Sequence, residues 1–392
     1  MTCPACGGTA LEPVHERDGV PVHSCLLVAD RQRALSFPRG DLRIVACREC
    51  GFVHNAAYDP AMSHYSADYE ETQGFSPHFR EFLAGLAARW VERHRLQGTR
   101  VVEIGCGKAE FHVELLRHGV AEAVGVDPGV KPDRIPEDLR DRLTLVPGFF
   151  PRDLTELDAA AVVCRHTLEH IGPVADFMRQ VRTAIGDRTD TAVLFELPGT
   201  LHVLREAAFW DVYYEHCSYF TLGSLSRLFR RTGFEVLDLA PAYDDQYLLV
   251  EARPVPTGEG PGEPHPAEEP VPVVLGAAAS FRASVDRTVT AWADEVRAVA
   301  ARGGRTVIWG SGSKGVAFLA ALGEDAAEVA CAVDINPYKH GRFMAGTGHE
   351  IVPPARLRDL RPDLVIAMNP VYVDEIQRDL DALGVQTVLK AL

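Results

Sequence analysis

The sequence predicts an α/β protein in which a small cysteine-rich module precedes two Rossmann-like units. Each unit is indicated by an apolar strand that ends in glycines, an amphipathic helix, and a second strand that ends in an aspartate. The module is indicated by two Cys-x-x-Cys-Gly sequences within the first 51 residues. The predicted parts are 1–60 (zinc-binding module), 61–253 (first Rossmann-like domain), 254–275 (linker) and 276–392 (second Rossmann-like domain).

Length, composition and charge restrict the kind of protein. The 392 residues exceed one ordinary domain, and a hydrophobic content of 46% is ample for packed cores. A formal net charge of −15 argues against nucleic acid as a partner. No apolar run approaches a membrane span, and the first residues lack a signal-peptide pattern. We therefore expect a soluble, cytoplasmic protein that binds neither nucleic acid nor membrane, and we leave open whether it is a monomer or a dimer.

Two pairs of cysteines predict a structural zinc site in residues 1–60. Two thiolates at the Cys-x-x-Cys spacing bind one tetrahedral Zn²⁺, and the following glycine permits the tight turn. A thioredoxin-like redox role is less favoured, because no helix follows either pair. Four thiolates close the site, so the metal would replace a core that so small a module cannot build. The expected ligands are Cys3, Cys6, Cys47 and Cys50, with Cys25, His15 and His23 as spare ligands and a hairpin between the knuckles.

Residues 61–100 predict a helix that begins at Ser76-Pro77 and buries one apolar side. Tyr65 and Tyr69 lie ahead of this helix, four residues apart. Their spacing alone slightly favours two aromatic residues at a domain junction over a functional pair. The apolar positions of the helix are Phe79, Phe82, Leu83, Leu86 and Trp90.

The unit at residues 101–127 predicts a nucleoside site, and its glycine spacing indicates which nucleoside. Asp127 closes the second strand and can accept both hydroxyls of a ribose. Gly105 and Gly107 are followed by Glu110 in place of the third glycine of a dinucleotide fold. Glu103 precedes the loop, where a carboxylate repels a pyrophosphate but suits a positively charged ligand. This pattern resembles the E/D-x-G-x-G loop of class I S-adenosylmethionine (SAM) methyltransferases, whose ligand carries a sulfonium and an amino group.

The resemblance implies that residues 61–253 form a class I methyltransferase domain with SAM as its cofactor. Arg165 and His166 follow the strand Ala160–Cys164, and the carboxyl ends of parallel strands face the ligand crevice. Phe149 and Phe150 fall where such folds place a loop beside the adenine. The expected cofactor-binding residues are Glu103, Gly105, Gly107, Lys108, Asp127, Pro128, Phe149, Phe150, Arg165 and His166.

Residues 211–220, Asp-Val-Tyr-Tyr-Glu-His-Cys-Ser-Tyr-Phe, concentrate ionisable and hydroxyl side chains. Such a run is not an ordinary core strand, because each buried polar group needs a partner. A solvated loop with one functional histidine is the alternative interpretation. A helix at Leu222–Arg231 and antiparallel strands at 233–236 and 246–252 are expected to complete the sheet.

Proline and glycine in residues 254–275 exclude regular structure and predict a linker, followed by a helix over Ser280–Ala301. In the next unit, Gly310, Gly312 and Gly315 satisfy G-x-G-x-x-G. Taken alone, and with Asp334 at the right distance for a ribose, this motif indicates NAD. The alternative is that Ser311, Ser313 and Lys314 hold a substrate phosphate at the helix N-terminus.

The order of these features resembles the three-domain sugar C-methyltransferase family of deoxysugar antibiotic biosynthesis, over nearly the whole chain. In that family, SAM binds the middle domain and a nucleotide-linked 4-keto sugar lies between the middle and C-terminal domains. A histidine in a Tyr-x-Glu-His string takes the proton from the sugar C3. The resemblance implies catalytic roles for Tyr213, Glu215, His216 and the N-terminal Tyr65 or Tyr69, and substrate contacts from His170, Tyr214, Ser311, Ser313, Lys314, Asn369 and Tyr372.

The chemistry is consistent with those roles. Carbon is nucleophilic only after deprotonation beside a carbonyl, so a base and a donor to the enolate oxygen are required. His216 is the best candidate for the base, because histidine titrates near neutrality. Glu215 could orient it or match its charge. The candidate donors are Tyr65, Tyr69, Tyr213 and His166.

Two departures from the family leave alternatives open. Tyr214 stands where relatives usually carry histidine, and the Trp-Gly-Ser-Gly-Ser-Lys loop at 309–314 differs from the usual version, as do the segments 346–350 and 368–370. The alternatives are O- or N-methylation of another metabolite, a bifunctional enzyme that also reduces with NAD(P)H, and a non-enzymatic zinc scaffold or SAM-sensing partner.

Overall fold

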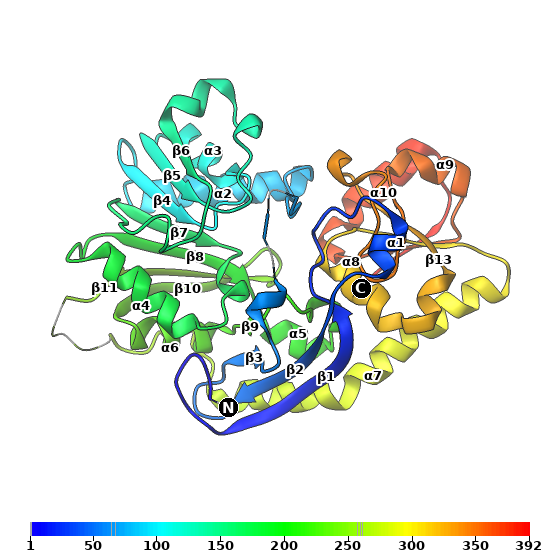
Figure 1. The fold of residues 1–392 in the computed structure, drawn as a ribbon, viewed down its shortest axis with the longest axis horizontal. Coiled ribbons are helices and arrows are strands. Elements are labelled where there is room, and N and C mark those ends of the chain that lie inside the picture. Colours follow the sequence, from blue (N-terminus) through cyan, green and yellow to red (C-terminus); the bar gives the residue numbers. More distant parts are fainter. Residues whose placement is uncertain (1, 64, 67, 257, 259, 261) are drawn as a thin grey trace.

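The computed structural model describes residues 2–63, 65–66, 68–256, 258, 260 and 262–392. Figure 1 places a large mixed sheet on one side and a parallel C-terminal sheet on the other, with the N-terminal strands below and between them. The predicted α/β class with two Rossmann-like units is therefore confirmed. The division at 60, 253 and 275 stays a prediction.

The N-terminal strands form an antiparallel sheet in the order β1-β2-β3-β9. The predicted hairpin between the two cysteine pairs is present, because β1 and β2 pair from Leu11↔Cys47 to Pro21↔Arg39. The last strand comes from the middle of the chain and begins two residues after His216. The elements are β1 (Leu11–Pro21), α1 (Arg31–Leu35), β2 (Arg39–Cys47), β3 (Val53–Asn55) and β9 (Ser218–Tyr219).

The large sheet has the order β10-β11-β8-β7-β4-β5-β6. Its central strands are parallel, and β10 and β11 close it in antiparallel pairing, as the sequence predicts. Because the parallel strands end at one edge, their following loops meet there. The strands are β4 (Arg100–Ile104), β5 (Glu122–Val126), β6 (Leu143–Val146), β7 (Ala161–Arg165), β8 (Ala192–Pro198), β10 (Phe234–Ala242) and β11 (Tyr247–Pro254).

Side-chain caps fix the first residue of two helices in this part of the chain. Ser76 caps α2, since its hydroxyl accepts a hydrogen bond from the Phe79 N–H at 3.2 Å and Pro77 needs no donor there. Thr221 caps α6 in the same way. The helices are α2 (Pro77–Arg93), α3 (Glu110–Arg117), α4 (Val174–Ile185), α5 (Leu201–Glu206) and α6 (Leu222–Arg231).

The C-terminal sheet is parallel throughout, in the order β14-β13-β12-β15-β16. Its first strand leads into α8 through the glycine loop at 310–315. The elements are β12 (Thr306–Trp309), α8 (Ser313–Leu322), β13 (Val329–Val333), β14 (Ile351–Val352), α9 (Leu357–Leu360), β15 (Leu364–Ala367), α10 (Val373–Leu383) and β16 (Val388–Ala391).

The predicted helix over Ser280–Ala301 is longer than expected, because α7 runs from Val271 to Ala301. Pro272 occupies the first turn, where the missing N–H costs no hydrogen bond, so this proline starts the helix and does not break it. Glu269, which lies in the predicted linker just before α7, is also held in place. The Glu269 carboxylate accepts from the Gly223 N–H at 2.9 Å and 3.0 Å at the start of α6.

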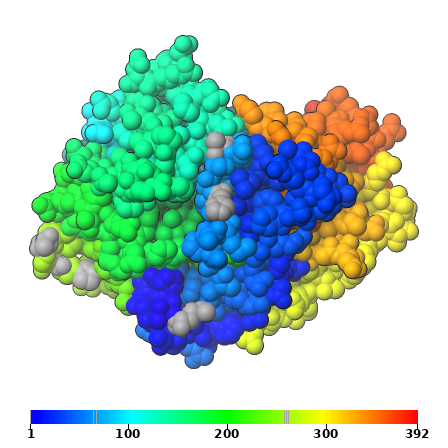
Figure 2. All heavy atoms as spheres, in the orientation of Figure 1, coloured from blue at the N-terminus to red at the C-terminus, as the bar shows by residue number. Residues whose placement is uncertain are grey.

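One hydrophobic cluster joins the two ends of the chain. It contains Val14 and Val22 from β1 and the following residue, Phe281 of α7, and Phe318 of α8. Figure 2 shows the N-terminal segment lying across the face between the large sheet and the C-terminal part. Among the described residues, no helix combines the length and apolar character needed to cross a bilayer.

Candidate functional site

A cavity of about 500 Å³ lies where the large sheet, the N-terminal segment and the C-terminal sheet meet. Its walls include the loops after β4, β5, β7 and β8, residues 65–66 and 69–76, and the loops after β12 and β15. A cavity at the carboxyl ends of parallel strands is the usual position of a ligand site in such folds.

The glycine loop after β4 is shaped for close approach of a ligand. Gly105 and Gly107 have positive φ angles of +73° and +52°, and a Cβ on Gly105 would overlap the Thr167 hydroxyl. The Gly107 N–H donates to one oxygen of Asp127 at 3.1 Å, and the Gly129 N–H donates to the other at 2.6 Å. The loop and the predicted ribose-binding carboxylate therefore form one unit at the cavity wall.

Glu103 is a buried carboxylic acid, and one of its two oxygens lacks a hydrogen-bond partner among the described residues. It is 2% exposed, and this oxygen is Oε2. His112 Nδ1 lies 3.2 Å from Oε2 but out of line for a hydrogen bond. Burial raises the pKa of Glu103 to about 8. A positively charged ligand group in the cavity would compensate this carboxylate.

Arg165 and His166 line the cavity and share the carboxylate of Glu196. The Arg165 guanidinium donates to both oxygens of Glu196 at 3.0 Å, and His166 Nε2 lies 2.8 Å from Oε1. Burial alone lowers the pKa of His166, but Glu169 and Glu196 raise it to about 9. His166 is therefore an imidazolium at neutral pH. The carboxylate partner in β8 was not predicted from the sequence.

The other predicted cofactor residues also line the cavity. Lys108 is anchored, since its Nζ donates to the Tyr69 carbonyl at 2.7 Å and to Glu71 at 3.2 Å. The Phe149 ring is 44% exposed, whereas the Phe150 ring packs on Phe177. The lining residues among this set are Lys108, Pro128, Phe149 and Phe150.

His216 lies in the cavity wall and is 8% exposed. A turn at Tyr214–Glu215 brings its ring back to Tyr213, whose hydroxyl lies 3.1 Å from His216 Nε2. Burial, followed by the positive charges of His166 and Lys314, lowers the pKa of His216 well below its usual value. The imidazole is therefore neutral and able to accept a proton at neutral pH.

His170 stands beside His216, with the two ring centroids 4.8 Å apart. Its Nδ1 lies 2.8 Å from the Tyr65 hydroxyl and 3.0 Å from the Glu215 carbonyl. Since a carbonyl only accepts, Nδ1 carries the proton and Nε2 is the nitrogen left with a lone pair in the neutral ring.

The Glu215 side chain does not line the cavity, unlike that of its neighbour His216. Its carboxylate accepts from the Ser24 N–H at 3.1 Å, lies 3.0 Å from His23 Nδ1, and accepts from the Tyr69 hydroxyl at 3.1 Å. Burial raises the pKa of Glu215, but the hydrogen bonds from His23 and Ser24, together with the neighbouring histidines, hold it below the usual value. The carboxylate therefore fixes Tyr69 from behind the cavity wall. The sequence offered no signal for Ser24.

Some predicted residues lie elsewhere, which corrects the expectations for them. Tyr214 is outside the cavity lining, because its buried hydroxyl accepts from the Asp59 N–H at 2.9 Å. Ser311 is also outside, since its hydroxyl donates to Asp334 at 2.5 Å. The spare zinc ligands lie away from the cysteine cluster: His15 packs on Phe281, His23 contacts Glu215 and Cys25 lies beside Ser313.

The C-terminal wall contains the remaining predicted substrate residues. Lys314 Nζ donates to Asp211 at 2.6 Å, and the Ser313 hydroxyl accepts from Ser24 at 2.7 Å. Two more side chains bridge to the large sheet, because Asn369 exchanges hydrogen bonds with Gln246 at 2.9 Å and Tyr372 donates to Gln73 at 2.8 Å. The lining residues from this part are Ser313, Lys314, Asn369 and Tyr372.

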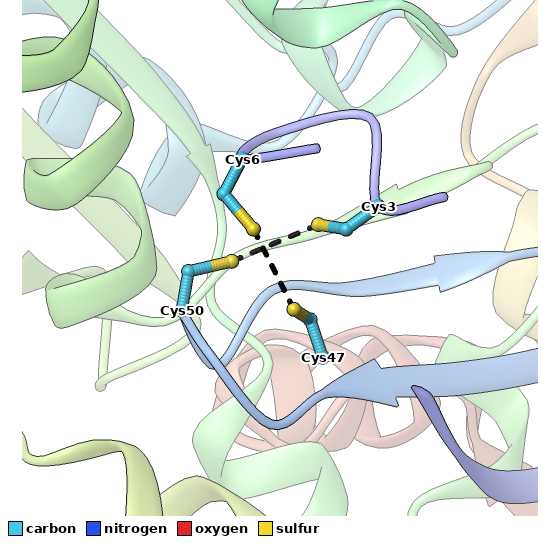
Figure 3. Close-up of side chains that lie close together, drawn as sticks. All are labelled: Cys3, Cys6, Cys47 and Cys50. Atoms are coloured by element: carbon cyan, nitrogen blue, oxygen red, sulfur yellow. Dashed lines mark hydrogen bonds between the residues drawn. The ribbon is translucent and has the colours of Figure 1, made fainter. Parts of the chain in front are cut away.

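Away from the cavity, the predicted cysteine pairs converge, as Figure 3 shows. The Sγ atoms of Cys3 and Cys50 are 3.7 Å apart, and those of Cys6 and Cys47 are 3.6 Å apart. A tetrahedral ion with Zn–S bonds of about 2.3 Å separates its sulfurs by about 3.8 Å. The four side chains therefore fit a closed zinc site.

Two family profiles match this chain. Residues 75–239 match a methyltransferase domain, and residues 275–388 match a C-methyltransferase C-terminal domain. The chain is also 28% identical over 361 residues to C-methyltransferase NovU of Streptomyces niveus, covering 86% of this chain and 81% of that protein. The two profiles thus cover most of the large sheet and most of the C-terminal sheet.

Parts of this chain are also similar to solved structures. The N,N-8-amino-8-demethyl-D-riboflavin dimethyltransferase RosA of Streptomyces davawensis is 22% identical with a TM-score of 0.39, over 45% of this chain and 55% of that chain. The 1,6-didemethyltoxoflavin-N1-methyltransferase of Burkholderia thailandensis is 18% identical with a TM-score of 0.38, over 46% and 82%. The match thus spans about half the length of the first of these two chains.

Proposed function

We propose that this chain, which is a SAM-dependent methyltransferase with the C-terminal domain of C-methyltransferases, methylates a carbon atom beside the carbonyl of a small keto substrate. The observation that carries the proposal is the neutral, buried imidazole of His216 in the cavity wall. Oxygen and nitrogen acceptors carry lone pairs of their own, whereas a carbon acceptor needs a base of this kind before it becomes nucleophilic.

His216 removes the proton from the carbon, and the electrons move onto the carbonyl oxygen. The Tyr213 hydroxyl holds the imidazole at Nε2. Tyr65 and Tyr69 supply hydroxyls at the same wall, and each is fixed by a partner, His170 and Glu215 respectively. The Tyr65 hydroxyl keeps its own proton free to donate to the developing oxyanion, and such a donor is typically worth about 3 kcal/mol. The Tyr69 hydroxyl donates to Glu215, so it would have to leave that carboxylate before it could do the same.

SAM would be held by the large sheet, and when bound it supplies an electrophilic methyl group on its sulfonium. The Asp127 carboxylate suits the two ribose hydroxyls, and the glycine loop leaves space beside it. Glu103 has an unsatisfied oxygen that suits the ammonium group of the cofactor. Lys108 and Pro128 border this end, and Phe149 and Phe150 offer apolar rings for the adenine.

The substrate class is a nucleotide-linked 4-keto deoxysugar, methylated at C3. This part of the proposal is supported by the extension of the cavity to the C-terminal sheet, where Ser313 and Lys314 stand at the N-terminus of α8. A helix N-terminus with a lysine suits the phosphates of a nucleotide. Asn369 and Tyr372 border the same side, and His170 lies beside the base.

The four-cysteine cluster binds one structural Zn²⁺. The proposal is supported by the convergence of the four sulfur atoms at distances that suit tetrahedral coordination. Four thiolates leave no open coordination position, so the metal takes no part in methyl transfer.

The glycine motif at 310–315 favours the NAD(P)H alternative, but the surroundings of Asp334 do not strengthen it. The Asp334 carboxylate that would bind the ribose already accepts from the Ser311 N–H at 3.0 Å and from the Ser311 hydroxyl, and it lies 3.5 Å from Lys339 Nζ. The ribose hydroxyls of a nicotinamide nucleotide would have to share the same Asp334 oxygen with Ser311 and Lys339.

Exchange of the C3 proton of a nucleotide-linked 4-keto deoxysugar for deuterium tests the base directly. With S-adenosylhomocysteine in place of SAM, methyl transfer is blocked and proton abstraction is observed alone. We expect His216→Gln to lose exchange by about 10²–10⁴-fold while its binding of S-adenosylhomocysteine is unchanged. The matched control is His118→Gln, since His118 is exposed at the end of α3. Exchange at the full rate in His216→Gln would exclude His216 as the base.

A further inference from the structure

Three possible metal ligands meet in the wall of the cavity, apart from the cysteine cluster. One carboxylate oxygen of Glu169 and one ring nitrogen each of His170 and His216 lie within 4.8 Å of one another. Glu169 and His170 belong to the 3-10 helix η4 (Leu168–His170) after β7, and His216 precedes β9. All three residues line the cavity, so a ligand can reach them.

Glu169 is the unusual member of this group. Its side chain is 3% exposed, and neither carboxylate oxygen has a hydrogen-bond partner among the described residues. The nearest cationic group is His166, whose Nδ1 lies 3.6 Å from Oε1 and whose other nitrogen is engaged by Glu196. A buried carboxylate normally accepts several hydrogen bonds or coordinates a metal. The two unpaired carboxylate oxygens of Glu169 therefore indicate that a hydrogen-bond donor or a cation binds there.

Each of the two histidine rings is held by a hydrogen bond, as the rings of metal-ligating histidines usually are. His170 Nδ1 donates to the Glu215 carbonyl, which leaves the Nε2 lone pair available. A ring N–H held by a backbone carbonyl is the usual support of a metal-ligating histidine. His216 is fixed by the Tyr213 hydroxyl. A neutral imidazole has one lone pair, which either takes a proton or binds a cation.

We propose that Glu169, His170 and His216 form a second cation site, which binds a first-row divalent transition metal and takes His216 out of use as a base. Two imidazoles and one carboxylate suit Mn²⁺, Fe²⁺, Co²⁺ or Zn²⁺, and three protein ligands leave positions open toward the cavity. The site itself is independent of the proposed function, whereas the inhibition rests on it, because it assumes that His216 deprotonates the substrate.

Titration of the zinc-loaded protein with Mn²⁺, followed by electron paramagnetic resonance, tests the site. Mn²⁺ prefers oxygen and imidazole ligands, so it does not compete for four thiolates. We expect one Mn²⁺ per chain. Glu169→Gln should bind Mn²⁺ about 100-fold more weakly, because removing a partner of a metal ligand already costs about 10- to 100-fold in metal affinity and Glu169 is itself a ligand. Glu92→Gln is the control, since Glu92 is exposed on α2. Binding of S-adenosylhomocysteine shows that each variant is folded.

The inhibition is tested in the same samples by deuterium exchange of the keto substrate. We expect exchange to fall in proportion to Mn²⁺ occupancy and to return when the ion is removed with a chelator. Absence of Mn²⁺ binding, or equal binding in Glu169→Gln, would overturn the site. Full exchange at full occupancy would overturn the inhibition. A protein that binds Mn²⁺ but never exchanges the substrate proton would count against the proposed function and leave the site standing.

Discussion

At the scale of single residues, His216 owes its role to what surrounds it. Burial, followed by the positive charges of His166 and Lys314, lowers its pKa well below the ordinary histidine value of 6.5. A base acts when it is neutral, which for histidine is above its pKa. A lowered pKa therefore moves the loss of activity to more acidic pH.

We expect kcat/KM for proton exchange to stay level as the pH falls from 8 to 6.5 and to decline only at lower pH. The pH profile of deuterium exchange with S-adenosylhomocysteine bound measures this, over the range in which the protein stays folded. A profile that has already fallen by half at pH 6.5 would contradict the assignment of a depressed pKa to the base.

Glu103 offers a second test at this scale. If its free oxygen binds the ammonium group of the cofactor, Glu103→Gln loses a hydrogen bond to a charged group. We expect a cost of about 2 kcal/mol, roughly 30-fold in the affinity for S-adenosylhomocysteine measured by calorimetry. Methylthioadenosine lacks the amino group, so its affinity should be the same in both proteins. Equal losses for both ligands would place the effect of Glu103 in the fold of the loop.

At the scale of elements, the cysteine cluster holds the ends of β2 and β3 to the first turn of the chain. It also contacts α6, because Arg227 Nε donates to the Cys50 carbonyl at 3.0 Å. The sheet formed by β1, β2 and β3 continues into β9, where the Asn55 N–H donates to the Cys217 carbonyl at 2.9 Å. The zinc site and the residue after the proposed base are thus joined by one sheet.

We expect one zinc ion per chain by elemental analysis, and its loss in Cys47→Ala together with a lower unfolding temperature. Metal binding contributes on the order of 10 kcal/mol to folding in small isolated zinc modules, so the destabilisation should be large. Cys331→Ala is the control, because Cys331 is buried in β13 and is distant from the cluster in the chain. Full retention of stability in metal-free Cys47→Ala would show that the cluster is not a folding element.

The elements were predictable where a local pattern determines them. The glycine loop, the cap at Ser76 and the paired cysteines each depend on a few adjacent residues. The turn at Tyr214–Glu215 was not predictable, although it decides which side chains face the cavity. The partners of Glu215 were also hidden, because Ser24 lies 191 residues earlier in the chain. The early start of α7 was missed because proline is tolerated in a first helical turn.

At the scale of the whole molecule, the segment between the N-terminal strands and α2 ties the two large parts together. Glu70 is 1% exposed and accepts from Arg134 at 2.7 Å and 3.1 Å and from Asn336 at 3.0 Å. Arg134 belongs to the large sheet's side of the cavity, and Asn336 follows β13. One buried acid thus contacts both parts.

We expect Glu70→Gln to lower the free energy of unfolding by about 3 kcal/mol, because it leaves Arg134 without its counter-charge. Urea denaturation of both proteins measures this, with Glu92→Gln as a control expected to change stability by less than about 0.5 kcal/mol. A variant as stable as the parent would mean that Glu70 is not a structural link between the two parts.

The position of the transferred methyl group tests the account most directly. The protein is incubated with SAM labelled with ¹³C in its methyl group and with a nucleotide-linked 4-keto deoxysugar, and the product is analysed by NMR. We predict a methyl group bonded to C3 of the sugar, with loss of the C3 proton. A labelled methyl on oxygen or nitrogen would contradict carbon methylation and the role of His216 as a carbon base.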